Sequence, residues 1–269
     1  MLNTSIYIII HDLYVEYGEC EAAAACCATN TMAESEIIGV LTASGSEVRG
    51  ALPIRQLHKW SLGGFGELVV ERHDGIAAAT GRKKKAKLAL PNPDNCTLVL
   101  SAVESFFLLS ASNLPKLHLR RPDAGQPASS TLLGDHECWS TFCHADPMFP
   151  QLYVAYRALR NAGWCIRDGL KFGVDFLLYD PHSGPEAHSS YGVLVNPPQH
   201  TCGERDWLWL QQRIRLTQQT SKALLLCSVD SPTDLTGKVT PITPSSVDNL
   251  EVRTVMLSAW SPGKEHASL

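Results

Sequence analysis

The chain has 269 residues, of which 44% are hydrophobic and 19% charged, so it can form one large domain or two smaller domains with packed cores. Its formal net charge of −4 and its pI of about 6.2 argue against a protein that binds nucleic acid mainly through a broad basic face. They do not exclude a nuclease, because a nuclease site needs only a few well-placed cations.

The first apolar stretch, residues 6–10, ends at His11 and Asp12. No basic residue precedes this stretch, and it is far shorter than the roughly 20 residues of a membrane-spanning helix. We therefore expect a β-strand there, and neither a signal peptide nor a membrane span.

Nine cysteines are scattered along the chain, and without a secretory signal we expect reduced thiols in the cytosol or nucleus. One cluster combines the residue types that bind zinc: His136, Cys138, Cys143 and His144. Its spacing, with Trp139 and Phe142 between the cysteines, favours buried free cysteines on an apolar helix face.

Two further features stand out in the first half. The basic run at residues 82–87 indicates a solvated loop, with nuclear import or RNA contact as the alternative. Ser101 and Glu104 have the spacing of a capping box before the apolar residues 106–109, so a helix is predicted to begin there.

Pro, Gly and Ser then become frequent, which places a linker at 123–134 between an N-terminal domain (1–122) and a C-terminal domain (135–269).

The second half has clearer patterns. Apolar residues at helical spacing predict a helix over 152–162, ended by Gly163. Strands are predicted at 164–167, 174–179, 190–195, 223–229 and 252–260, with a helix within 204–222 and a loop at 231–249. Most connections are too short for crossovers, so we expect an α/β (mixed α+β) protein whose mixed sheet is flanked by helices.

Three blocks of this half resemble the tRNA-splicing endonucleases of archaea and eukaryotes. They are GLKFGVDFLLY (169–179) with HSSY (188–191), then RLTQQTSKALLLC (215–227), and VRTVMLSAW (252–260). The third block is similar to the last strand of the eukaryotic catalytic subunit that cuts the 5′ splice site, although the known subunits of that kind are longer. The resemblance covers residues 136–269 and implies a restriction-endonuclease-like sheet there, after a small N-terminal α/β domain.

The resemblance places the family's catalytic residues on Tyr179, His188 and Lys222. Their chemistry suits metal-free RNA cleavage, in which the substrate's own 2′-hydroxyl attacks the phosphorus and leaves a 2′,3′-cyclic phosphate and a 5′-hydroxyl. Such a step needs a base, an acid at the leaving oxygen and a positive charge near the phosphate. Histidine titrates near neutrality and suits the acid, and Lys222 suits the stabilising charge. Tyr179 is either the base or the group that orients the 2′-hydroxyl, because a phenol is a weak base at neutral pH.

The resemblance also implies an RNA-binding pair, Arg215 and Trp260, which would hold a flipped base by stacking and cation–π attraction. Asp175 is expected to be a structural carboxylate or one that supports the catalytic residues from behind. The remaining aromatic residues of this region are expected in the core: Trp164, Phe172, Tyr191 and Trp207.

Two other functions are alternatives to metal-free cleavage of RNA. A metal-dependent nuclease of the restriction type places a carboxylate two residues before a lysine, and no such pair occurs in the chain. A non-catalytic structural subunit of the same complex would lack one or more of the three catalytic residues, and all three are present.

The resemblance implies precursor tRNA as substrate, a heterotetramer of two catalytic and two structural subunits, no cofactor or metal, and the nucleus as compartment. The last strand is a plausible pairing surface for a partner. Residues 1–150 hold 12 Lys+Arg and 16 Asp+Glu, whereas residues 151–269 hold 11 of each. Since the catalytic half is neutral, we expect the chain alone to bind RNA weakly.

Overall fold

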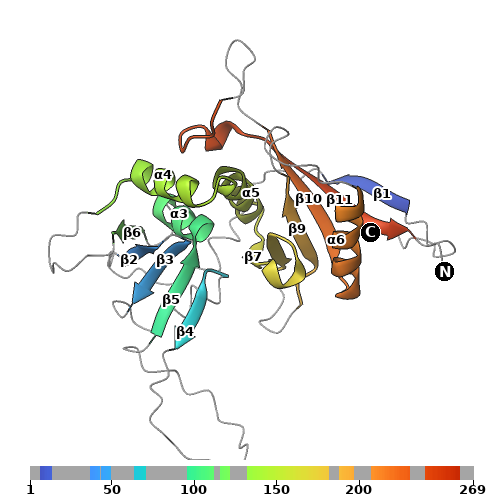
Figure 1. Cartoon of the computed structure of the whole chain (residues 1–269), viewed down its shortest axis with the longest axis horizontal. Helices are drawn as coiled ribbons and strands as arrows, with labels where there is room; N and C mark the ends of the chain where they lie inside the picture. The colour runs from blue at the N-terminus through green and yellow to red at the C-terminus, as the bar shows by residue number, and fades with distance from the viewer. Residues whose placement is uncertain are drawn as a thin grey trace, which may run out of the picture. The chain divides into compact units, whose positions relative to one another are not determined.

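The structure, a computed structural model, describes residues 7–13, 37–42, 44–49, 64–70, 96–111, 116–121, 132–181, 188–196, 207–230 and 240–260. The chain divides into two compact units, one formed by residues 1–23 and 150–269 and the other by residues 24–149. Each unit contains one mixed sheet with helices, which confirms the mixed α/β class (Figure 1). Within the described ranges, no helix has the length and apolarity needed to cross a bilayer.

The unit of residues 24–149 is built on a five-stranded sheet in the order β4-β5-β3-β2-β6. Its strands are β2 (Ile37–Thr42), β3 (Gly45–Arg49), β4 (Glu67–Val70), β5 (Cys96–Ser101) and β6 (Leu117–Arg120). Only β2 and β6 pair in parallel among the described strands of this sheet. Helix α3 (Ala102–Ser110) packs on the sheet, and α4 (Asp135–Ala145) packs on α3.

The predicted capping box at the start of α3 is confirmed. The Ser101 hydroxyl accepts a hydrogen bond from the Glu104 backbone N–H (3.4 Å), and the Glu104 carboxylate accepts one from the Ser101 N–H (2.8 Å). The same carboxylate accepts a bond from the Gly66 N–H (2.9 Å), just before β4. Glu104 therefore fixes the helix start and ties it to a neighbouring strand.

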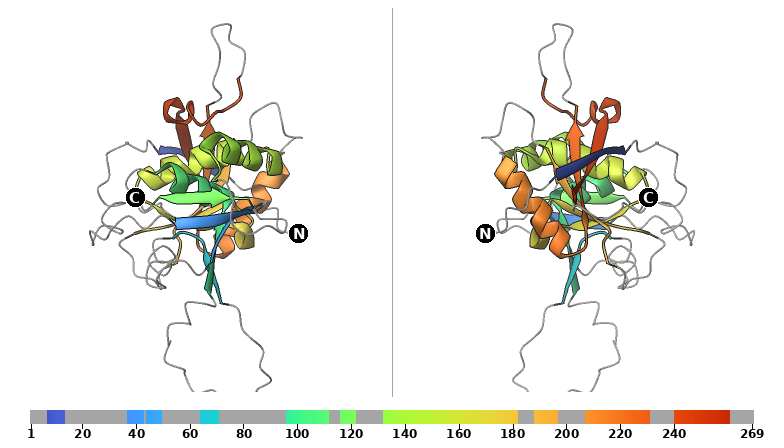
Figure 2. Two further views of the ribbon diagram at one scale, coloured as in Figure 1. Left: turned by 90° about the vertical axis from the view of Figure 1, so that its left-hand side faces the viewer. Right: turned by 90° about the vertical axis from the view of Figure 1, so that its right-hand side faces the viewer.

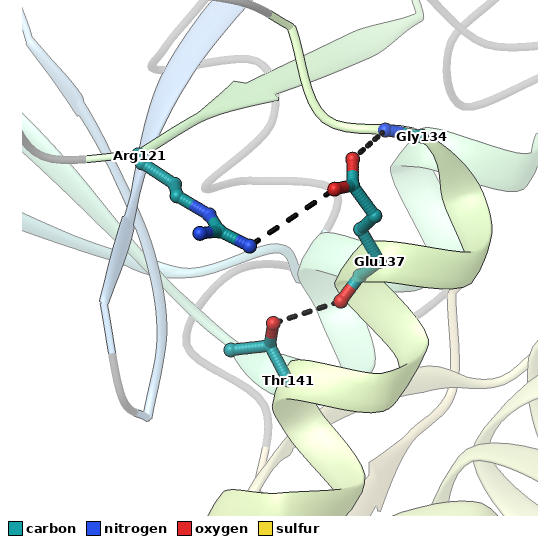
Figure 3. A network of polar contacts seen from close by, with 4 residues as sticks. All are labelled: Arg121, Gly134, Glu137 and Thr141. Carbon is teal, nitrogen blue, oxygen red and sulfur yellow. Dashed lines mark hydrogen bonds and ion pairs between the residues drawn. The ribbon is translucent and has the colours of Figure 1, made fainter.

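Glu137 has a similar role at the start of α4 (Figure 3). Its carboxylate accepts a hydrogen bond from the Gly134 N–H (3.2 Å) and lies 4.0 Å from the Arg121 guanidinium. The Thr141 hydroxyl donates to the Glu137 carbonyl (2.8 Å) one turn later. These contacts satisfy a backbone N–H that the first turn of a helix leaves without an intrahelical partner.

The cysteine cluster of the sequence lies on α4, and Cys138 is fully buried, as predicted for a free core cysteine. Burial, with the Asp135 and Glu137 carboxylates nearby, raises the pKa of this thiol to about 11. His136 and His144 are exposed, so the four side chains do not share one environment. Within the described part of the chain, no group of three or more His, Cys, Asp or Glu side chains is placed to hold a metal ion.

The other unit contains a six-stranded sheet in the order β1-β11-β10-β9-β8-β7. The strands are β1 (Tyr7–Leu13), β7 (Cys165–Asp168), β8 (Phe176–Tyr179), β9 (Tyr191–Val195), β10 (Ala223–Val229) and β11 (Val252–Trp260). β9 and β10 pair in parallel, whereas the remaining pairs are antiparallel. Every strand that the sequence predicted in the second half is present, and so is the one predicted near the N-terminus.

Helices α5 (Phe149–Asn161) and α6 (Trp207–Gln219) pack on opposite faces of this sheet. The rings of Tyr156 on α5 and Phe176 on β8 lie 5.7 Å apart. The next strand residue, Leu177, belongs instead to the core cluster that contains Ile214 of α6. Because successive strand residues face opposite sides, this alternation shows that the sheet is covered on both faces.

The structural division differs from the expected domains in two places. Helix α4 belongs to the unit of residues 24–149, because its Trp139 ring packs edge-on against Phe106 of α3 at 5.0 Å. Strand β1 belongs to the other unit, because it pairs with β11 from Tyr7↔Trp260 to Leu13↔Thr254 (Figure 2, right). The basic run at 82–87 and residues 123–131 of the expected linker lie outside the described residues.

Candidate active site

The three predicted catalytic residues lie at one edge of the six-stranded sheet, namely the edge formed by the ends of its inner strands. Tyr179 is the last residue of β8, His188 comes three residues before β9, and Lys222 immediately precedes β10. β8 is antiparallel to β9, and β9 is parallel to β10. The end of β8 and the starts of β9 and β10 therefore meet at the same edge, although 43 residues of sequence separate Tyr179 from Lys222.

Two hydrogen bonds fix this edge. The Ser190 N–H donates to the Leu178 carbonyl (3.1 Å), and the Ala223 N–H donates to the Ser190 carbonyl (3.1 Å). Ser190 therefore joins the strand end that carries Tyr179 to the strand start that follows Lys222. His188, which is exposed, stands two residues before this junction.

The Lys222 side chain is buried, with only 8% of its surface exposed. Its ammonium donates to the carbonyls of Ser189 (3.3 Å) and Thr220 (3.4 Å) and lies 5.0 Å from the centre of the Phe172 ring. No carboxylate among the described residues forms an ion pair with it. Burying a cation without a counter-ion lowers the stability of the fold, and the charge remains available to an anionic ligand.

The turn after α6 explains how Lys222 reaches this place. The Thr217 carbonyl accepts hydrogen bonds from the N–H groups of both Thr220 (3.1 Å) and Lys222 (3.0 Å). Ser221, between them, has a φ of 55°, in the left-handed region that non-glycine residues seldom adopt. The chain thus passes from the helix end to β10 in a tight turn that holds the lysine at the sheet edge.

Tyr179 is half-buried on the α6 side of the sheet. Its ring packs against the core cluster of this unit, as do Phe172, Trp209 and Leu210. Lys222 faces the same side, because its ammonium lies over Phe172. The phenol and the ammonium are therefore held by one packed layer rather than by independent loops.

The predicted RNA-binding pair is placed only in part. Arg215 lies on the exposed side of α6. Trp260 is the last residue of β11, opposite Tyr7 of β1, and its side chain lies outside what the structure describes. The clamp that these two residues would form on a base stays a prediction.

The remaining predictions for this region concern Asp175 and the aromatic residues that were expected in the core. The Asp175 carboxylate accepts a hydrogen bond from the Val195 N–H (2.7 Å), so it is structural as predicted. Trp164 and Tyr191, which were predicted in the core, are half-buried, and their rings pack edge to face with centroids 5.5 Å apart. The core assignment of Trp207 is wrong, because 53% of its surface is exposed. Burial along α6 is complete only at Ile214 and Thr217, two turns after this first helical residue.

Phe172 makes a contact that no sequence pattern indicated. Its place in the core was correct, since it packs against the main cluster, but one face of its ring also supports the Lys222 ammonium. The only signal was its position in the GLKFG block, because the contact joins residues 50 positions apart.

Residues 149–237 match the family profile described as the tRNA intron endonuclease, catalytic C-terminal domain. This segment contains Tyr179, His188 and Lys222.

Individual relatives agree with this match. The chain is 30% identical over 176 residues to the tRNA-splicing endonuclease subunit Sen2 of Mus musculus, which covers 63% of this chain and 36% of that protein. It is 29% identical over 169 residues to the subunit Sen2-1 of Arabidopsis thaliana, covering 63% of this chain and 66% of the relative. It is also 29% identical over 140 residues to the tRNA-splicing endonuclease of Methanothermobacter thermautotrophicus, covering 52% of this chain and 74% of the relative.

The chain spans about a third of the length of the vertebrate relatives that it matches, with 36% of the mouse protein covered. Over residues 149–237 the chain is therefore similar to the catalytic C-terminal domain of tRNA intron endonucleases, and over a longer stretch it is similar to the Sen2 subunits.

Proposed function

We propose that this chain is a catalytic subunit of a tRNA-splicing endonuclease and that it cleaves precursor tRNA at an intron boundary. The observation that carries the proposal is the position of Tyr179, His188 and Lys222 at strand ends along one sheet edge, with the Lys222 ammonium 3.3 Å from the carbonyl of the residue after His188. The names of the relatives supply the substrate, precursor tRNA.

The proposed reaction is attack of a ribose 2′-hydroxyl on the adjacent phosphorus. The bond from phosphorus to the 5′-oxygen breaks, which leaves a 2′,3′-cyclic phosphate and a 5′-hydroxyl. His188 donates the proton that the departing oxygen takes up, and its exposure leaves it accessible to a bound strand. Tyr179 accepts the 2′-hydroxyl proton or orients that hydroxyl for attack.

Lys222 stabilises the negative charge that grows on the phosphate oxygens. Its ammonium is buried, is held by two backbone carbonyls, and has no ion-pair partner among the described residues. A cation fixed in this way needs little reorganisation when charge develops, which is the basis of electrostatic catalysis. A carboxylate partner would have neutralised much of this effect.

For the splice site, we propose the 5′ boundary, supported by the resemblance of residues 252–260 to the last strand of 5′-cutting subunits. Arg215 and Trp260 are proposed to hold an unstacked base of the substrate. The exposure of Arg215 on α6 is compatible with contact to RNA.

We propose that the chain acts in a heterotetramer with a second catalytic subunit and two structural subunits. The word "subunit" in the names of the relatives supports membership of an assembly. We further propose that this assembly acts in the nucleus, which imaging of the tagged full-length chain tests.

The test is cleavage of an intron-containing precursor tRNA by the full chain purified with its accompanying subunits. We expect a cut at the 5′ intron boundary with cyclic phosphate and 5′-hydroxyl ends, in the presence of excess chelator. Lys222→Ala and His188→Ala should each abolish this cut while leaving the assembly intact. Loss of cleavage in chelator would instead indicate a metal-dependent nuclease.

An unchanged cut in both variants would mean that another subunit supplies the chemistry and that this chain is structural. Arg167→Ala, a change on β7 outside the proposed catalytic set, is the matched control and should cleave normally.

A further inference from the structure

The contact between Lys222 and Phe172 joins the proposed catalytic cation to an element that the reaction itself does not require. The ammonium lies 5.0 Å from the centre of the ring, within the roughly 6 Å over which cation–π attraction is significant. The two carbonyls of Ser189 and Thr220 hold the ammonium through hydrogen bonds, and the ring supports it through its π face. Together they form a cage without a carboxylate among the described residues.

The ring is rigidly placed. Phe172 ends a short 3-10 helix, η2 (Leu170–Phe172), and its N–H donates to the Gly169 carbonyl (2.8 Å). Gly173 follows with a φ of 68°, and its carbonyl accepts a hydrogen bond from the Arg213 guanidinium (2.8 Å). The turn that carries the ring is therefore attached to α6.

The lysine depends on the same helix. Arg213 is on α6, and the Arg213 carbonyl accepts a hydrogen bond from the Thr217 hydroxyl (3.0 Å). Thr217 in turn accepts the Lys222 N–H through its own carbonyl (3.0 Å). Ring and ammonium are thus fixed to one helix from two sides, although Phe172 and Lys222 lie 50 positions apart in the sequence.

We propose that Phe172 is a positioning residue for the cleavage reaction: its ring holds the Lys222 ammonium at the sheet edge, aimed at the phosphate without neutralising its charge. This inference rests on the proposed function. An aromatic face attracts a cation but carries no net charge, so it positions the ammonium and leaves the positive charge for the substrate. A carboxylate in this place would position the lysine equally well and cancel the charge that the reaction needs.

The test uses single-turnover cleavage by the assembled complex and an NMR signal of the full chain. Phe172→Leu keeps an apolar side chain but removes the π face, and Phe172→Tyr restores the face. Because a cation–π contact of this kind is worth about two- to thirty-fold in rate, Phe172→Leu should slow the cleavage step by that factor with an unchanged KM. Phe172→Tyr should cleave within about two-fold of the parent chain.

The NMR signal of the Lys222 Cε protons reports the position of this side chain relative to the Phe172 ring. The lysine Cε protons are labelled selectively, and the Lys222 signal is identified by its loss in Lys222→Arg. The ring should shield these protons in the parent chain and in Phe172→Tyr, and the shielding should disappear in Phe172→Leu. Should Phe172→Leu fail to fold, Phe172→Met takes its place.

Leu226→Ala is the matched control, since Leu226 packs against the same core cluster as Phe172. It should lower the unfolding temperature and leave both the rate and the Lys222 signal unchanged. A rate and signal in Phe172→Leu like those of the parent would overturn the inference, as would an equal loss in Phe172→Tyr or Leu226→Ala. Lys222→Ala separates the two proposals: parental cleavage by that variant refutes the proposed function, whereas its inactivity beside an unaffected Phe172→Leu refutes only the positioning role.

Discussion

The buried charge of Lys222 lowers the stability of the fold but serves the proposed reaction. Its ammonium is 8% exposed and is held by carbonyls and a ring rather than by a carboxylate. Replacing a buried charge with an apolar side chain of similar length is often neutral or stabilising, because the charge is costly to remove from water. Fold stability therefore does not account for this lysine, whereas the proposed reaction does.

Lys222→Met should consequently separate the two properties. We expect the free energy of unfolding to stay within about 1 kcal/mol of the parent value or to rise, and cleavage to fall about 10²- to 10³-fold. Urea unfolding and single-turnover cleavage measure the two effects. Lys171→Met, at an exposed lysine, should change neither. A large loss of stability in Lys222→Met would show that the lysine is a structural residue.

Cys227 gives a prediction about pH. Burial, and secondarily the Asp175 carboxylate, raises the pKa of this thiol from 9.0 to about 12. The unfolded chain ionises this thiol near pH 9 and the folded chain does not until about pH 12, so its contribution to stability is complete below pH 9 and is lost as the pH rises between these values. Urea unfolding at pH 8 and pH 10 should show this loss, and Cys227→Ala should show a smaller one. Equal losses in the two proteins would contradict the assignment.

At the scale of elements, the turn between β7 and β8 is constrained by its close approach to α6. Gly173 has a φ of 68°, and a Cβ added there would lie 2.2 Å from the Arg213 guanidinium and 2.8 Å from the Leu216 side chain. The left-handed backbone alone costs a residue with a Cβ roughly 1–2 kcal/mol. The glycine therefore allows η2 to approach α6 closely.

Gly173→Ala should lower the free energy of unfolding by about 2 kcal/mol, from backbone strain and the displaced Arg213 contact. It should also slow cleavage, because the turn carries the ring beneath Lys222. Leu170→Ala, at a neighbouring side chain that is 81% exposed, should change stability by less than about 0.5 kcal/mol. Denaturant unfolding of both variants checks the difference, and equal stabilities would refute the strain argument.

The elements also show what sequence patterns predict well. The helix and strands between residues 149 and 229 have regular periodicity, and the capping box at Ser101 is local, so all were predicted. The strands β2 to β6 were not predicted; β3, with the sequence GSEVR, lacks clear apolar alternation. Pairing of β1 with β11, and of the Phe172 ring with Lys222, joins distant segments, which periodicity does not detect.

At the scale of the whole molecule, β1 changes the expectation for β11. The last strand was expected to offer its free edge to a partner, but β1 pairs with it along seven residues. The edge strand of the described sheet on this side is therefore β1. A partner strand that adds to this sheet would meet the backbone of β1, or would have to displace it.

The distribution of charge bears on how RNA is held. The net charge is −4, and the excess of acidic residues lies in residues 1–150, while residues 151–269 hold 11 basic and 11 acidic residues. Affinity for RNA depends strongly on phosphate neutralisation by lysine and arginine. Lys222 is buried at the sheet edge, so the proposed function requires further basic groups to contact the phosphates of the RNA.

We therefore expect the full chain alone to bind precursor tRNA weakly, and the assembled complex to bind it much more tightly. Each phosphate contact contributes about 0.7–0.9 to the slope of log affinity against log salt concentration, so the slope measures how many contacts each form makes. Binding titrations between 50 and 200 mM salt should give a shallow slope for the chain and a steep one for the complex. Arg215→Ala should weaken binding by the complex, whereas Arg253→Ala, outside the proposed RNA-binding pair, should not. Tight binding by the isolated chain with a steep salt dependence would show that it holds the tRNA without its partners.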